Sequence, residues 1–198
     1  MRYCTQCVQP DTRPGIFFSE DGVCGACLWE KEKQHIDWAS RKKELEAIAS
    51  WAKENKKGPY DCAIGVSGGK DSTFQALYAR DTLGLRPLLV CSEPNFNTAV
   101  GRANLENLKS LGFDTLSLRV NPHIMKELVR RDFYSILNIS RPSEYPLYAS
   151  VCIIADKFDI PLIIQGENAG QRLGASKDTG TGGDAFNQFK LNTVKADP

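Results

Sequence analysis

The chain has 198 residues, with 25 Lys and Arg against 24 Asp and Glu, for a formal net charge of +1. This length allows one well-buried domain and a small appendage, and the balanced charge makes nucleic acid an unexpected partner. The start, Met-Arg-Tyr-Cys, has no apolar core of signal-peptide length, and no run of about 18 apolar residues occurs. The sequence therefore predicts a soluble, cytoplasmic protein with no membrane partner.

Two Cys-x-x-Cys pairs, Cys4 with Cys7 and Cys24 with Cys27, stand sixteen residues apart within residues 1–30. This spacing is typical of a four-cysteine zinc ribbon or knuckle, whose four protein ligands leave no open position and give the metal a structural role. An iron–sulfur cluster, a redox pair or unrelated buried thiols are the alternatives.

The other three cysteines, Cys62, Cys91 and Cys152, lie in apolar runs, which predicts that they pack in the core. Residues 31–58 are expected to link the metal module to a main domain over residues 59–198. Apolar residues recur at helical spacing over residues 37–56, and Gly58-Pro59 follows. The lysines of this helix are interpreted as a solvated face.

Residues 65–72 read Gly-Val-Ser-Gly-Gly-Lys-Asp-Ser, after an apolar run and before a helical pattern. Adjacent glycines let the backbone point successive N–H groups at an anion, and the following helix contributes its positive end. We therefore expect Ser67, Gly68, Gly69, Asp71 and Ser72 to bind phosphate, with charge from Lys70. Asp follows the Gly-Lys pair, so the loop is not a Walker A loop, and it lacks the Gly-x-Gly-x-x-Gly spacing of dinucleotide-binding folds.

Short apolar strands alternate with helices along the rest of the chain, which predicts an α/β fold with an open, doubly wound parallel sheet. The expected strands cover residues 62–66, 87–91, 115–120 and 161–165. The expected helices cover residues 71–81, 98–112, 125–133 and 147–158, with Thr98 and Asn121-Pro122 as helix-start residues.

Ligands of such sheets bind at the carboxyl ends of the strands. The loop from Ser67 and the segment Gly166-Glu167-Asn168 both follow strands, so we expect them to converge on one crevice. Gly166 would lie against the nucleotide. Glu167 is interpreted either as a magnesium or substrate ligand or as a surface carboxylate. Residues 173–184 are polar and glycine-rich, which favours an active-site lid.

The loop resembles the Ser-Gly-Gly-x-Asp-Ser loop of the PP-loop, or N-type, ATP pyrophosphatases. The whole chain resembles the N-acetyl sugar amidotransferases of the WbpG and PseA type. Four elements in one order carry the likeness: Cys4-Thr-Gln-Cys7 with residues 10–16 (Pro-Asp-Thr-Arg-Pro-Gly-Ile), Cys24-Gly-Ala-Cys27, residues 67–72, and Gln165-Gly-Glu-Asn168. Members of that family are longer, so the chain is expected to correspond to their N-terminal portion.

The resemblance implies an adenine nucleotide alpha hydrolase-like fold, with ATP, Mg²⁺ and Zn²⁺ as cofactors. It implies that Asp71, Lys70 and Glu167 act in catalysis, and that ATP adenylates the acetamido oxygen of an N-acetyl sugar of O-antigen or nonulosonic acid biosynthesis. Ammonia from a HisH-like glutaminase, delivered with a HisF-like subunit, would then give an acetamidino group. The alternatives are a tRNA-thiolating PP-loop enzyme and a non-catalytic zinc-ribbon, nucleotide-binding adaptor.

Overall fold

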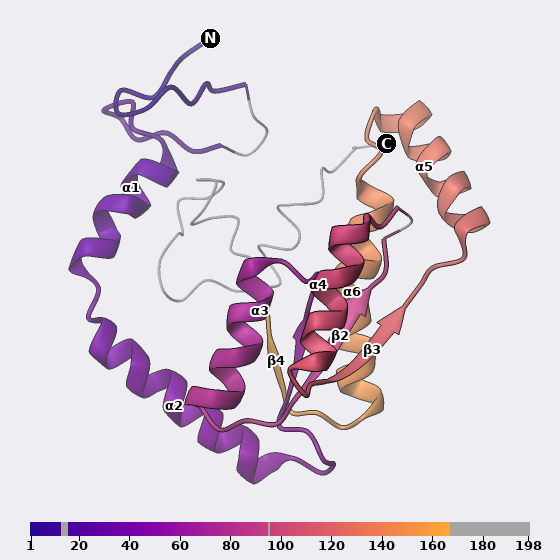
Figure 1. The fold of residues 1–198 in the computed structure, drawn as a ribbon. Coiled ribbons are helices and arrows are strands. Elements are labelled where there is room, and N and C mark those ends of the chain that lie inside the picture. The colour runs from indigo at the N-terminus through magenta and orange to yellow at the C-terminus, as the bar shows by residue number, and fades with distance from the viewer. Residues whose placement is uncertain (13–15, 95, 167–198) are drawn as a thin grey trace. The chain divides into compact units, whose positions relative to one another are not determined.

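The computed structural model describes residues 1–12, 16–94 and 96–166, drawn in colour in Figure 1. These residues belong to two compact units, one containing residues 1–38 and the other residues 39–166. Each unit has hydrophobic clusters of its own. Glu167, Asn168 and the lid expected over residues 173–184 lie outside the described residues.

The first unit is built from two turns and a helix. Antiparallel bridges join Tyr3 to Pro10 and Phe18 to Cys24. The helix α1 (Gly25–Glu32) and the 3₁₀ turn η1 (Lys33–His35) follow. The turn-rich sequence did not predict α1. The buried residues of this unit include two of the paired cysteines: Cys4, Phe18, Val23 and Cys24.

A four-stranded parallel sheet forms the centre of the second unit. Its strands are β1 (Cys62–Gly65), β2 (Pro87–Ser92), β3 (Asp114–Leu118) and β4 (Leu162–Ile164), in the order β3-β2-β1-β4. Ile64 of β1 lies opposite Leu89 of β2 and Ile164 of β4. The predicted strands and the parallel α/β sheet are therefore confirmed.

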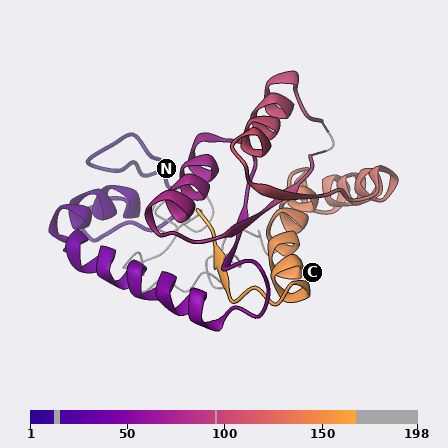
Figure 2. The same cartoon turned by 60° about the horizontal axis from the view of Figure 1, so that its bottom comes forward.

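Helices cover both faces of this sheet (Figure 2). On one face, side chains of α2 (Trp38–Asn55), α3 (Lys70–Leu77) and α4 (Ala99–Ser110) pack against β1 and β2. On the other face, α6 (Arg141–Lys157) packs against the same strands through Val151 and Ala155. The strands read as continuous apolar runs because both faces are buried.

The helix ends follow the local chemistry of the sequence. The α2 helix matches the helical pattern of residues 37–56, and α3 continues into a π turn, Tyr78–Thr82. The Thr98 hydroxyl caps α4 by accepting from the N–H of Gly101 at 3.0 Å. The Asn121 side chain caps α5 (Pro122–Ile136) by accepting from the N–H of His123 at 2.9 Å. Both caps were predicted.

The α6 helix begins six residues before the predicted start at residue 147. Pro142 lies in the first turn, where a missing N–H costs nothing, and Pro146 removes only one helical hydrogen bond. The Arg141 guanidinium also holds this start in place, because it donates to both carboxylate oxygens of the buried Asp132 at 2.7 and 3.0 Å. The sequence predicted a later start because two prolines close together usually interrupt a helix.

One cysteine prediction was wrong. Cys62 and Cys91 are buried in the sheet as expected, but Cys152 is exposed. Successive helical residues point about 100° apart. Because Val151 and Ala155 face the sheet, Cys152 lies on another side of α6.

The amino edge of the sheet is fastened by the buried Asp61, which directly precedes β1. Its Oδ2 accepts from the N–H of Arg86 at 2.6 Å, and its own N–H donates to the carbonyl of Arg86 at 2.9 Å. The Lys56 Nζ lies 2.8 Å from Oδ1 and balances the buried charge. The starts of β1 and β2 are thereby joined.

None of the helices in the described part of the chain combines the length and apolar character needed to cross a bilayer.

Candidate functional site

The loop of residues 67–69 joins the carboxyl end of β1 to the start of α3. Gly68 has a φ of +75°, a region that favours glycine. A Cβ at this position would lie 3.0 Å from Cβ of Asn104 and 3.2 Å from the backbone nitrogen of Leu105. Gly68 therefore meets both a conformational and a packing requirement, because the loop lies directly against α4.

The polar groups of the loop are exposed, and the hydrogen bonds between them are long. The Ser72 hydroxyl accepts from the N–H of Ser67 at 3.4 Å and donates to the carbonyl of Gly69 at 3.3 Å. The Ser67 hydroxyl accepts from the N–H of Gly69 at 3.4 Å. These distances lie at the long end of hydrogen bonding, and the N-cap residue of α3 is Gly69, which has no side chain to cap the helix. An incoming anion could exchange for these bonds at small cost.

Lys70 and Asp71 form the first turn of α3, and both side chains are exposed. The Lys70 Nζ lies 2.7 Å from Oδ1 of Asp71. An exposed pair of this kind contributes little to stability. Breaking this pair so that Lys70 turns toward a phosphate would therefore cost little.

The sheet order places β4 next to β1, while β2 lies on the other side of β1. The point between β1 and β4 is where ligands of open parallel sheets bind. Gly166, which follows β4, lies beside α3: a Cβ built on it would meet the Gln75 Nε2 at 2.0 Å. Gly166 thus lies close to the helix that follows the loop, but Glu167 and Asn168 are outside the described residues, so the convergence of the two segments on one crevice stays a prediction. Glu167, the next residue, is not described, so its role stays a prediction.

A hollow of about 620 Å³ opens beside the loop, between α4 and the face of the sheet that α4 covers. Its floor is apolar and includes Val66 of the loop entrance, Cys91 of β2 and Leu108 of α4. Charged side chains line it as well, among them Glu93 after β2. The sequence did not predict this hollow, although Glu93 follows a strand end just as Ser67 does.

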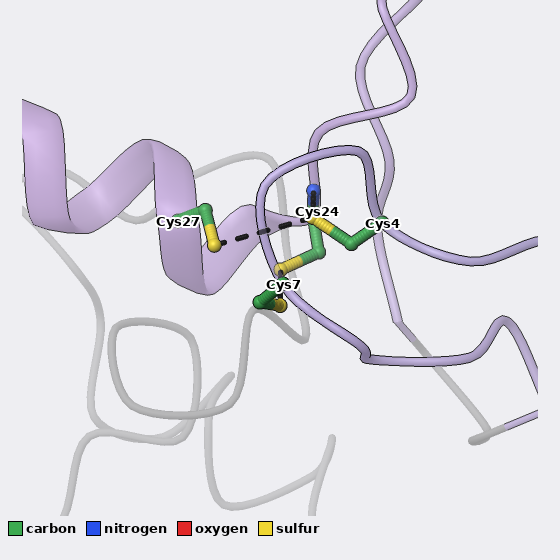
Figure 3. A group of neighbouring side chains, drawn as sticks. All are labelled: Cys4, Cys7, Cys24 and Cys27. Carbon is green, nitrogen blue, oxygen red and sulfur yellow. Dashed lines mark hydrogen bonds between the residues drawn. The ribbon is translucent and has the colours of Figure 1, made fainter.

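The four paired cysteines of the first unit form a compact cluster (Figure 3). Their sulfur atoms all lie within 4.8 Å of one another. The Cys7 and Cys24 sulfurs are 3.7 Å apart, and those of Cys4 and Cys27 are 4.0 Å apart. Four thiolates around tetrahedral zinc, at about 2.3 Å each, would be separated by about 3.8 Å. The cluster fits zinc, as the cysteine spacing predicted.

Backbone groups prepare one of these sulfurs as an anion. The Cys4 Sγ accepts from the N–H groups of Cys24 at 3.2 Å and Gln6 at 3.4 Å. Burial opposes ionisation of Cys4, but the hydrogen bonds from Cys24, Gln6 and Cys7 outweigh it and lower its pKa to about 6. Burial raises the pKa of Cys24, and burial with the neighbouring sulfurs raises that of Cys27 to about 12. A bound cation would remove this repulsion.

No model of a known protein family matches the chain, and no curated protein matches it. Among solved structures, NMN synthetase from Francisella tularensis is similar, with a TM-score of 0.46 and 20% sequence identity. The match covers 64% of this chain and 55% of the synthetase, so the chain spans about half the length of that protein. At this level of likeness the match assigns neither a family nor an activity.

Proposed function

We propose that residues 59–198 belong to a PP-loop ATP pyrophosphatase domain, in which the loop from Ser67 to Ser72 holds the β- and γ-phosphates of ATP. One observation supports this most directly. The loop has exposed, weakly bonded amides and hydroxyls at the carboxyl end of β1, beside the N-terminus of α3, whose N-cap residue is Gly69. Such a site favours a polyanion because its donors are already oriented.

In this proposal the base and ribose of ATP occupy the adjoining hollow, which starts at Val66 and has ample volume for a nucleoside. Asp71 would bind or orient the Mg²⁺ that bridges the phosphates, and Lys70 would offset their charge. The four-cysteine cluster would hold Zn²⁺ in a closed, structural site. Glu167 is proposed as a further magnesium or substrate ligand.

We propose further that the reaction is an amidation of an N-acetyl sugar, as in the family that the order of motifs resembles. The acetamido oxygen attacks the α-phosphorus of ATP, and the bond to the β-phosphate oxygen breaks, releasing pyrophosphate. Ammonia then adds to the activated carbon, and AMP leaves with the former acetamido oxygen. The product carries an acetamidino group.

Ammonia would come from a HisH-like glutaminase with a HisF-like subunit, in the biosynthesis of O-antigen or nonulosonic acids in the cytoplasm. This activity and these partners are proposed for the whole protein, which would also supply the residues that complete the sugar site.

The test is to incubate the protein with ATP, Mg²⁺, ammonium and candidate acetamido sugars, and to measure AMP, pyrophosphate and the amidine product by mass spectrometry. Replacing Ser67 with Ala should lower pyrophosphate release about 10²- to 10³-fold, the usual loss for one preorganised donor. Ser50→Ala is the matched control, because Ser50 is exposed on α2 and its hydroxyl donates to a backbone carbonyl of the same helix. Unchanged turnover in Ser67→Ala would refute the loop assignment.

The products also separate this function from the alternatives. ADP and orthophosphate would exclude a pyrophosphatase. AMP formation that depends on tRNA and a sulfur donor would replace the sugar by tRNA as the substrate. If ATP binds but is not turned over under any of these conditions, the remaining alternative is a non-catalytic, nucleotide-binding adaptor.

A further inference from the structure

Glu93 is held at a fixed place in the hollow. It directly follows β2, and its N–H donates to the carbonyl of Leu118 in β3 at 2.8 Å. This bond extends the hydrogen-bond ladder between β2 and β3 by one residue, so the sheet fixes the backbone position of Glu93. The side chain is half-buried and lines the hollow.

The Glu93 carboxylate lies near two other side chains that line the hollow. Burial raises the pKa of the Cys91 thiol on the hollow floor, and the negative charge of Glu93 adds to this effect, which indicates that the two side chains are close. Lys109 also lines the hollow. Its pKa is raised mainly by the hydrogen bond to Glu106 at 2.7 Å, and the charge of Glu93 adds a smaller effect. In the described residues, no hydrogen bond or ion pair of the Glu93 carboxylate is found, so its oxygens can accept from a ligand.

The strand order fixes which part of a nucleotide Glu93 can reach. Parallel strands lie about 4.8 Å apart, and β2 is the neighbour of β1 on the side of the hollow. A carboxylate that follows β2 therefore begins about one strand spacing from the loop that follows β1. This is the step from the phosphates of a nucleotide to its ribose. In other parallel nucleotide-binding sheets, an acidic residue in this region accepts from ribose hydroxyls.

We propose that Glu93 accepts hydrogen bonds from the 2′- and 3′-hydroxyls of the nucleotide ribose, and thereby selects ribonucleotides over deoxyribonucleotides. An ionised carboxylate is an acceptor only, with two oxygens that match the two donors of a diol. The same charge would repel a 2′-phosphate. This inference rests on the proposed function, since it assumes that the loop holds the phosphates of the same molecule.

The experiment measures the affinities of ATP and 2′-deoxy-ATP for the whole chain by calorimetry, in the presence of Mg²⁺. The unaltered protein should bind ATP about tenfold to a hundredfold more tightly, as expected for a hydrogen bond to a charged group. Glu93→Gln should lose most of this preference by weakening ATP more than 2′-deoxy-ATP, which has only its 3′-hydroxyl to donate to Glu93. Glu127→Gln is the control, because Glu127 is exposed on α5 and does not line this hollow; it should keep the preference.

Equal affinities of the two nucleotides for the unaltered protein would overturn the assignment of Glu93. An equal weakening of both nucleotides in Glu93→Gln would also overturn it, because a magnesium ligand or a residue needed for the fold would act in that way. Glu93→Asp, with circular dichroism to verify folding, repeats the test if Glu93→Gln does not fold. Failure of the unaltered protein to bind ATP at all would instead refute the proposed function, and this inference with it.

Discussion

Gly68 offers the sharpest test of how the loop is built. A residue other than glycine at its φ of +75° costs about 1–2 kcal/mol. The added Cβ would also meet Cβ of Asn104 at 3.0 Å and the backbone of Leu105 at 3.2 Å, and crowding of this kind costs about 1–3 kcal/mol. Gly68→Ala should therefore lower the free energy of unfolding by about 2–5 kcal/mol.

Gly112 provides the control for the backbone term. It has a φ of +86°, but a Cβ there would meet no atom of the described residues within 4 Å. Gly112→Ala should therefore cost only the conformational part, about 1–2 kcal/mol. The difference between the two variants, about 1–3 kcal/mol, measures the contact between the loop and α4.

Urea unfolding followed by circular dichroism measures both variants, with equal m-values required for the comparison. Nucleotide binding is measured beside it: Gly68→Ala should lose ATP affinity, whereas Gly112→Ala should retain it. If both variants lose the same stability, the loop does not pack on α4 and the geometry of the site is wrong.

Three further predictions concern other parts of the chain. Gly166→Ala should cost no more than about 0.5 kcal/mol, because the nearest atoms that its Cβ would meet among the described residues belong to the flexible end of Gln75; a larger loss in urea unfolding would mean that this amide is held rigidly. Arg141→Met should destabilise the second unit by about 3–5 kcal/mol, since it leaves a buried carboxylate without its partner; a loss below about 1 kcal/mol, the scale of an exposed pair, would contradict a buried pair. Zinc binding at pH 7 should release at least two protons, because the pKa of Cys24 is raised and that of Cys27 is about 12 in the metal-free cluster. Zinc affinity should accordingly fall as the pH is lowered, and calorimetry in buffers of different ionisation enthalpy would detect the release.

The sequence predicted those features that depend on local patterns. Continuous apolar runs indicated the strands, and Thr98 and Asn121 indicated the starts of two helices. The spacing of the cysteine pairs indicated the cluster, because two tight turns of this kind can bring four sulfurs together.

The features that the sequence did not predict depend on contacts between distant residues. The start of α6 depends on the pair of Arg141 with Asp132, which offsets two prolines that locally suggest a break. The exposure of Cys152 depends on which side of the helix faces the sheet, and an apolar run does not specify this. The hollow beside Glu93 exists because α4 and the strands leave space there, which no local pattern records.

The contacts of Asp61 with Lys56 and Arg86 join the amino ends of β1 and β2, whereas the loop follows the carboxyl end of β1. The alignment of β1 and β2 is thus secured at the amino ends of the strands, and it depends less on the loops at their carboxyl ends. Loops at the carboxyl ends of the strands, where small molecules bind, can therefore change in sequence while the pairing of β1 with β2 is kept.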